Sequence, residues 1–281
     1  MKNEEQELLK PKTDVVFKAI FTSEKGIEAL ESFLRAVLNI PLDKPIKIKI
    51  INPITNAEKK DDKTSIIDVR VETDKEIINV EIQVNSDPTM RDRIVFGVSK
   101  TVTNQKTKGE NYKLKKVISI VITGYKLIQE HQEYHDIFNY ASLKTGCTFS
   151  KSTEIHTLEL PKLPKEDDRT MLWNWLKFIK SEKKEEFEML AQKDSGIDQA
   201  VSILKDISQD EAMRMLAHNR EMAEWSLNGR LQATKEEGLE QKAHETAVEL
   251  LKMGLSLENI SQAVKMPIDW VEQLQIDITN K

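Results

Sequence analysis

The pattern of apolar and polar positions divides the first part of the chain into alternating helical and extended segments. Apolar residues recur at helical spacing over residues 14–38, where Gly26 interrupts the run, and again over residues 89–107. Alternating or continuous apolar runs of strand length predict extended segments over 46–51, 65–84, 116–124 and 153–160. This order of elements predicts a mixed α/β sheet flanked by helices.

The chain changes character after about residue 166, where segments rich in Glu and Lys predict helices and no strand. Because Pro161 and Pro164 precede this change, we expect a domain over residues 1–164 and an all-helical C-terminal region over residues 165–281.

Residues 244–276 of this helical region have the spacing of a helix-turn-helix. The second helix carries Asp269, Glu272 and Asp277, whereas a DNA-reading helix brings Arg, Lys or Asn to phosphates and bases. We therefore interpret it as a packing or partner-binding unit, and a homo-oligomer formed through the helical C-terminal region is one candidate assembly.

Segment 65–84 has the alternation of a β-hairpin, and its pairing register follows from the turn. A two-residue turn at Asp74-Lys75 and a four-residue turn around it both pair positions whose residue numbers sum to 149. Asp68 is therefore predicted to lie directly across from Glu81.

The predicted hairpin gathers polar groups on the face opposite its apolar side chains. Asp68, Glu81 and Gln83 share this face. Like charges at opposed positions destabilise a sheet, and a divalent cation would relieve the repulsion. Mg²⁺ prefers one or two carboxylates with water and phosphate oxygens. The alternative is an ordinary solvated face on which Arg70 offsets the acidic charge.

A nucleic-acid partner would have to bind a local surface, because the net charge of −5 gives no general basic field. Residues 100–116 hold six lysines against the single acid Glu110. The candidate DNA-backbone contacts in and before this segment are Arg91, Arg93, Lys100, Lys106, Lys108 and Lys113. The alternative is that this segment is only a solvated helix end and loop that does not contact DNA.

The sequence also indicates in which cellular compartment the protein resides. The single Cys147 excludes an intrachain disulfide and suits a reducing cytosol, and we expect it to be a small buried residue. The polar first residues do not resemble a secretory signal, and no apolar stretch approaches the roughly 20 residues that span a bilayer. We therefore expect a cytoplasmic protein without a membrane partner.

Over about residues 9–164 the chain carries an ordered series of short motifs. They are Lys12-Thr-Asp14-Val-Val-Phe17-Lys18-Ala-Ile-Phe21, Leu34-Arg-Ala-Val-Leu38-Asn39, Ile67-Asp68-Val69, Val80-Glu81-Ile82-Gln83, Arg91 with Arg93, Gln105, Gly109-Glu110-Asn-Tyr112, Leu114-Lys-Lys-Val-Ile118-Ser119-Ile120 and Ile155-His156-Thr-Leu158-Glu159-Leu160. Together these motifs resemble the PD-(D/E)XK nuclease family transposases, also called recombination-promoting nucleases.

The resemblance implies a restriction-endonuclease-like core and metal-dependent DNA cleavage, associated with recombination or mobile elements. It implies that Asp68 and Glu81 hold Mg²⁺ or Mn²⁺, with Asp14 as a further ligand. A helix N-cap is the alternative role for Asp14.

Gln83 stands where the wider superfamily usually has Lys. Gln can orient water or phosphate by hydrogen bonding, but it carries no positive charge. The resemblance thus makes Gln83 the third catalytic position of a DNA endonuclease. The alternative function is a DNA- or protein-binding module with a weak or inactive nuclease core.

Overall fold

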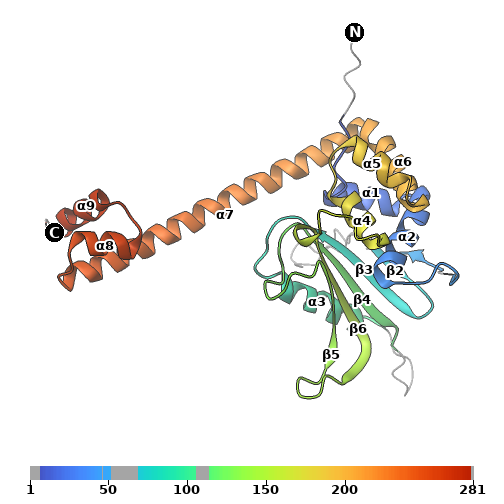
Figure 1. The fold of residues 1–281 in the computed structure, drawn as a ribbon, viewed down its shortest axis with the longest axis horizontal. Coiled ribbons are helices and arrows are strands. Elements are labelled where there is room, and N and C mark those ends of the chain that lie inside the picture. The colour runs from blue at the N-terminus through green and yellow to red at the C-terminus, as the bar shows by residue number, and fades with distance from the viewer. Residues whose placement is uncertain (1–6, 46, 52–68, 106–113, 280–281) are drawn as a thin grey trace, which may run out of the picture. The chain divides into compact units, whose positions relative to one another are not determined.

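The computed structural model describes residues 7–45, 47–51, 69–105 and 114–279. The chain forms two compact units, Met1–Glu221 and Met222–Lys281. The first unit is built on a six-stranded sheet with the strand order β1-β2-β3-β4-β6-β5 (Figure 1). The strands are β1 (Lys49–Ile50), β2 (Val69–Glu72), β3 (Glu76–Gln83), β4 (Lys116–Thr123), β5 (His135–Ala141) and β6 (Thr148–Glu159).

The sheet is mixed, as the order of elements predicts. Strands β1, β2 and β3 are antiparallel neighbours, β3, β4 and β6 run parallel, and β5 returns antiparallel to β6. In the β2–β3 hairpin the pairs run from Val69 with Val80 to Glu72 with Ile77, so every pair sums to 149. The predicted register is confirmed for these residues, and Asp68 lies outside the described residues.

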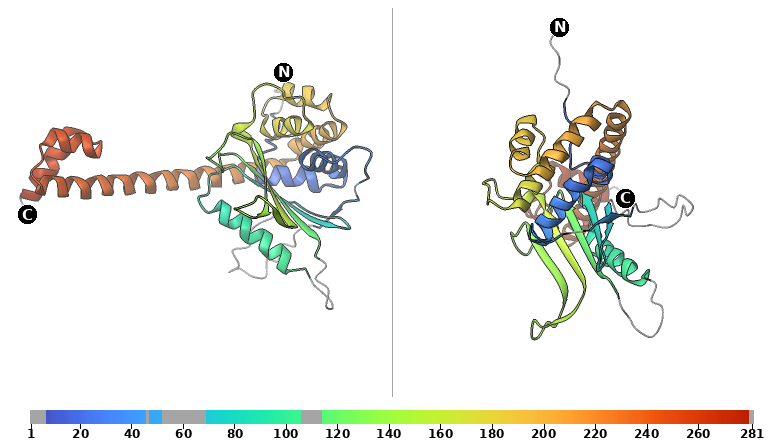
Figure 2. Two further views of the ribbon diagram at one scale, coloured as in Figure 1. Left: turned by 60° about the horizontal axis from the view of Figure 1, so that its bottom comes forward. Right: turned by 90° about the vertical axis from the view of Figure 1, so that its right-hand side faces the viewer.

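Helices cover both faces of the sheet (Figure 2). One face carries α1 (Asp14–Thr22), α2 (Ile27–Leu38), α4 (Met171–Lys180), α5 (Lys184–Ala191) and α6 (Ser195–Gln209), and the other carries α3 (Met90–Thr103). The apolar run 14–38 is divided by a short 3₁₀ turn, Glu24–Gly26. A Cβ at Gly26 would lie 2.1 Å from the carbonyl oxygen of Ile20, so this turn requires glycine.

Helices α4, α5 and α6 share the core of the sheet. Trp175 on α4 is fully buried, and its ring lies 5.7 Å from that of Phe21 and 5.8 Å from that of Phe33. Its indole Nε1 donates to Ser32 Oγ at 3.0 Å, and Ser32 in turn donates to Asp194, the N-cap of α6. The first compact unit therefore continues to Glu221, past the change in composition near residue 164.

The regular elements described after residue 165 are all helices. After α6 they are α7 (Glu211–Lys252), α8 (Leu257–Val264) and α9 (Ile268–Thr279), with short turns between them. In the second unit, Ala247, Ile260, Val271 and Leu274 form a small buried core. Among the residues described, no helix combines the length and the apolar character needed to cross a membrane.

Two features differ from the sequence-based expectation. Strand β5 has no counterpart among the predicted strands, and β6 begins at Thr148, earlier than the expected start at 153. Cys147 is exposed at the turn between these strands, so its predicted burial was wrong.

Candidate active site

Glu81 and Gln83 lie on β3, on the side of the sheet that faces α3. The alternate residues Val80 and Ile82 are buried in the main core, which turns Glu81 and Gln83 to the opposite face. Glu81 pairs in register with Val121 of β4, which packs beneath α3. The Glu81 side chain is only 13% exposed, so its carboxylate is held at the sheet surface rather than in open solvent.

The Glu81 carboxylate contacts a guanidinium from α3. Nη2 of Arg93 lies 3.1 Å from Oε1 of Glu81, and Nη1 of the same group lies 2.6 Å from Oδ2 of Asp87. Asp87 also accepts hydrogen bonds from the backbone N–H and the hydroxyl of Thr89, at 2.8 and 2.7 Å. Asp87 therefore ties the loop before α3 to Arg93, and Arg93 bridges two carboxylates.

The electrostatics of this cluster favour its charged forms. Burial raises the pKa of Asp87, but hydrogen bonds from Arg93 and Thr89 outweigh it, so this pKa falls below its usual value. Burial lowers the pKa of Arg93, yet the hydrogen bond that it donates to Asp87 and the charges of Glu81 and Asp87 raise this pKa overall. Burial also raises the pKa of the neighbouring Tyr125, so its phenol remains neutral.

Gln83 ends β3 in a crowded backbone environment. Its amide Nε2 donates to the carbonyl oxygen of Asn85 at 3.2 Å, which orients the side chain. The backbone N–H of Gly124 donates to the carbonyl oxygen of Gln83 at 2.9 Å. A Cβ at Gly124 would lie 2.5 Å from the carbonyl oxygen of Val84, so only glycine fits this close approach.

The donor atoms of this cluster suit a divalent cation in part, because both of its carboxylates also pair with Arg93. Glu81, Asp87 and Arg93 together carry two negative charges and one positive charge, which leaves a formal charge of −1. Carboxylate oxygens are the ligands that Mg²⁺ and Mn²⁺ prefer. Within the described ranges no group of three His, Cys, Asp or Glu residues could hold a metal ion by itself. A complete site would need Asp68, which lies outside those ranges.

Asp14 is the first residue of α1, and it is engaged elsewhere. Its Oδ2 lies 2.5 Å from Nη2 of Arg220 on α7, and its Oδ1 accepts from the backbone N–H of Val15 at 2.7 Å. The N-cap of α1 is Thr13, so the alternative interpretation of Asp14 as the N-cap was wrong. The structure thus pairs Asp14 with Arg220, while Glu81 is paired with Arg93.

The predicted DNA-binding residues have different surroundings. Arg93 contacts the candidate site, whereas Arg91, which is 52% exposed, pairs with Glu130 at 3.1 Å. Nζ of Lys100 lies 6.0 Å from the ring centroid of the exposed Phe96. Lys106, Lys108 and Lys113 lie outside the described residues.

The other two lysines of the basic segment form ion pairs. Lys115 lies 2.7 Å from Glu72, and Lys116 lies 2.8 Å from Glu154. These two pairs reduce the local positive charge that the sequence indicates.

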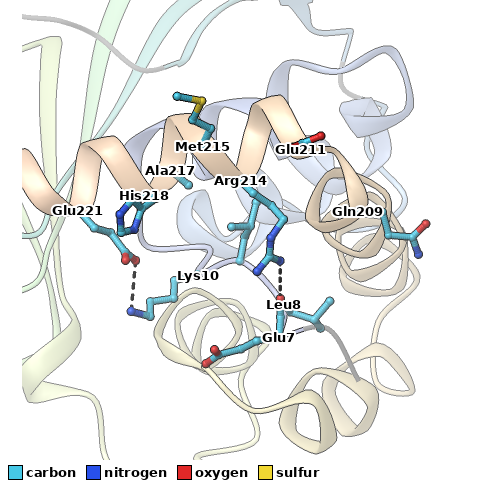
Figure 3. Close-up of a pocket in the computed structure, with 11 residues that line it drawn as sticks. Glu7, Leu8, Lys10, Gln209, Glu211, Arg214, Met215, Ala217, His218 and Glu221 are labelled. Atoms are coloured by element: carbon cyan, nitrogen blue, oxygen red, sulfur yellow. Dashed lines mark hydrogen bonds and ion pairs between the residues drawn. The ribbon is translucent and has the colours of Figure 1, made fainter. Parts of the chain in front are cut away.

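A separate cavity of about 870 Å³ lies between the N-terminal segment and the first turns of α7 (Figure 3). Arg214 donates to the carbonyl oxygen of Glu7 at 2.9 Å, and Lys10 pairs with Glu221 at 3.2 Å. Its basic and acidic side chains largely pair with one another or with the backbone, so we assign it no ligand.

Asp87 and Tyr125 are members of the cluster that the sequence does not predict. Asp87 lies in the turn sequence Asn85-Ser-Asp-Pro88, which signals a loop and not chemistry. Tyr125 directly follows Gly124 at the end of β4. The loop between β3 and α3 brings Asp87 to Arg93, and the pairing of β3 with β4 brings Tyr125 close to both of them.

Comparison with known proteins gives one family match. The family model described as PD-(D/E)XK nuclease family transposase matches residues 11–234, which is most of the chain. No curated protein and no solved structure matches the chain significantly. The matched range contains both Glu81 and Gln83 and continues through α4, α5 and α6 into α7.

Proposed function

The chain belongs to the PD-(D/E)XK nuclease family transposases, and from that premise we propose that it is a metal-dependent endonuclease that hydrolyses DNA phosphodiester bonds during recombination or the movement of mobile elements. One observation carries the proposal. The half-buried carboxylate of Glu81 lies on the same strand face as Gln83, within a cluster of net negative formal charge.

In this proposal Asp68 and Glu81 hold Mg²⁺ or Mn²⁺, and Gln83 orients water or a phosphate oxygen. A divalent ion in such a site lowers the pKa of water and neutralises charge on the phosphate. Asp14 is proposed as a further ligand. Because Asp14 is paired with Arg220, that role requires this ion pair to open.

A second candidate function is a DNA- or protein-binding module whose nuclease core is weak or inactive. The observation in its favour is the neutral Gln83 at the position where the wider superfamily usually has Lys. The two functions differ in one measurable respect, because only the first converts supercoiled DNA into cut products when a divalent cation is present.

The proposed function is tested by a plasmid-nicking assay with Mg²⁺, Mn²⁺, Ca²⁺ or a chelator. We expect cleavage with Mg²⁺ or Mn²⁺ and none with chelator, and a loss of about 100-fold or more in Glu81→Gln. The control variant is Glu76→Gln, the same substitution at the start of β3. Nicking that does not need a metal ion, or an equal loss of cleavage rate in Glu81→Gln and Glu76→Gln, would count against Glu81 as a metal ligand.

The proposed DNA surface consists of Arg91, Arg93, Lys100, Lys106, Lys108 and Lys113. Each phosphate contact releases condensed counterions, so the affinity should fall steeply with salt. Fluorescence anisotropy across a salt series gives the slope of the logarithm of the DNA-binding constant against the logarithm of the salt concentration. The magnitude of this slope should decrease by about 1 when Lys100 or Lys108 is replaced by Ala. A flat salt response would contradict a backbone-binding surface.

We also propose that the chain forms a homo-oligomer through its helical C-terminal region. Support comes from large apolar side chains exposed on α7, including Trp225, Leu227 and Leu231, which are 74%, 48% and 52% exposed. Light scattering coupled to size exclusion should give more than one chain per particle. Leu227→Glu with Leu231→Glu should reduce it to a monomer, and a wild-type monomer would refute the assembly.

A further inference from the structure

The candidate site lacks the positive charge that cleavage of a phosphodiester requires at position 83. Charge develops on the phosphate oxygens in the transition state, and fixed positive groups aimed at it supply a large part of the catalysis. Gln83 provides only a neutral amide, and its Nε2 already donates to Asn85. A cationic side chain near Glu81 would supply this charge in addition to the charge of the bound divalent ion.

Arg93 is a cationic side chain that the fold brings to the Glu81 carboxylate. It lies on the first half of α3, and Met90 and Ile94 of this helix are buried against the sheet around Val121. This packing places Nη2 of Arg93 3.1 Å from Glu81, the residue two positions before Gln83 on the same strand face. The Arg93 side chain is 37% exposed, so a phosphate can reach it.

Asp87 holds this guanidinium at one end. Nη1 of Arg93 lies 2.6 Å from Asp87, and two hydrogen bonds from Thr89 fix the Asp87 carboxylate in turn. One amino group of Arg93 is thereby anchored, and the other points toward Glu81. A planar guanidinium stays charged at any physiological pH and matches the geometry of phosphate oxygens.

We propose that Arg93 supplies the positive charge that Gln83 cannot, and that Asp87 is the positioning residue that holds its guanidinium for this role. In the structure this guanidinium pairs with Glu81. Glu81 would help to hold the divalent cation, and Nη2 of Arg93 would then be available to a phosphate oxygen of the DNA. This inference rests on the proposed function and makes Arg93 part of the reaction centre.

The experiment measures single-turnover cleavage with saturating protein and Mg²⁺. Removing one donor to a developing oxyanion typically costs about 10²–10³ in rate, so we expect Arg93→Ala to be slower by that factor. Arg169→Ala serves as the control, because this exposed arginine lies beside Asp167, in the segment before α4, and has no contact with the residues of the site among those described above. Arg91→Ala should instead weaken DNA binding, since Arg91 lies on the proposed phosphate surface.

Further variants separate the effect of the positive charge at position 93 from any effect of the substitution on folding. Arg93→Lys and Arg93→Gln have similar size, but only Lys carries charge, so the Lys variant should cut about tenfold faster or more. In the Arg93→Ala background, Gln83→Lys should restore the rate at least about tenfold, because it returns a cation to the site. Calorimetric titration with Mn²⁺ should show binding to Arg93→Ala that is tighter than, or equal to, wild-type binding, whereas a merely structural role would weaken it.

The outcomes distinguish this inference from the proposed function. If wild-type protein cuts and Arg93→Ala cuts within about threefold of it, the inference is wrong and the proposed function stands. Equal rates for the Lys and Gln variants, or no recovery from Gln83→Lys, would overturn it in the same way. If the wild-type protein cuts no DNA with any cation, both the proposed function and this inference fail.

Discussion

Replacing Trp175 by alanine tests whether the helices after residue 164 and the sheet form one cooperative unit. Trp175 lies on α4 and is fully buried. Its ring contacts those of Phe21, Phe33 and Phe178, with centroids 5.7, 5.8 and 5.7 Å apart, and its Nε1 donates to Ser32. The substitution therefore removes contacts to α1 and α2 at once.

The expected loss is about 3–5 kcal/mol in the free energy of unfolding. This is the usual cost of a Trp-to-Ala change in a core, where the lost burial and the remaining cavity add together. The lost aromatic contacts and the lost hydrogen bond to Ser32 favour the upper half of that range. With a urea dependence of about 2.5 kcal/mol per molar, a 4 kcal/mol loss lowers the unfolding midpoint by roughly 1.6 M.

The assay uses the single cysteine of the chain as a reporter. Cys147 is exposed at the turn between β5 and β6, so a fluorophore attached there reports on the sheet and not on α4. Urea unfolding is followed both by this fluorophore and by circular dichroism. We expect Trp175→Ala to move the Cys147 transition by the full amount, because sheet and helices unfold together.

Leu42→Ala is the control, because this large apolar side chain of the first unit is 76% exposed and its removal should change stability by less than about 0.5 kcal/mol. If Trp175→Ala leaves the Cys147 transition in place and shifts only part of the dichroism signal, α4–α6 form a separate module. That result would refute the single-core description of the first unit.

Three other changes have definite expected outcomes. Burial, and the positive charge of the neighbouring His156, lower the pKa of His135 to about 4. As the pH falls from about 6.5 to 4, His135 therefore takes up a proton in the unfolded state before it does so in the folded state. Thermal melts across this range should show the free energy of unfolding falling by about 1–2 kcal/mol, a value reduced for solvent screening, and His135→Gln should make this pH dependence weaker. Lys162→Met leaves the buried Glu159 carboxylate without its ion-pair partner at 2.8 Å and should cost about 3–5 kcal/mol in chemical unfolding; an unchanged midpoint would contradict the pairing. Gly124→Ala forces a Cβ against the backbone of Val84 and should cost about 1–3 kcal/mol and slow cleavage, whereas wild-type rates would show that the end of β3 tolerates displacement.

The hairpin could be predicted from the sequence because its constraints are local. Val69 and Val71 alternate with polar residues, and the turn around Asp74 fixes the pairing, so the register follows from the period of two. Strand β5 could not be predicted in this way. Ile137 and Tyr140 are 50% and 53% exposed, so neither face of β5 has the burial that produces an alternating pattern.

The candidate site was predictable only in part for a related reason. Glu81 and Gln83 lie on one strand, and period-two spacing is enough to place them on one face. The contact between Arg93 and Glu81 depends on how α3 packs onto the sheet, and no sequence spacing encodes that packing. Composition likewise shows the change to helices after residue 164 but not that these helices join the core of the sheet.

The proposed role of Glu81 as a metal ligand is decided by magnesium-dependent cleavage with the wild-type protein and with Glu81→Gln. Linear and nicked products are measured from supercoiled plasmid, with Glu76→Gln as the control and chelator as the blank. We expect cation-dependent cutting by the wild-type and Glu76→Gln proteins and a loss of about 100-fold or more in the cleavage rate of Glu81→Gln. Cleavage by Glu81→Gln at the wild-type rate would contradict it.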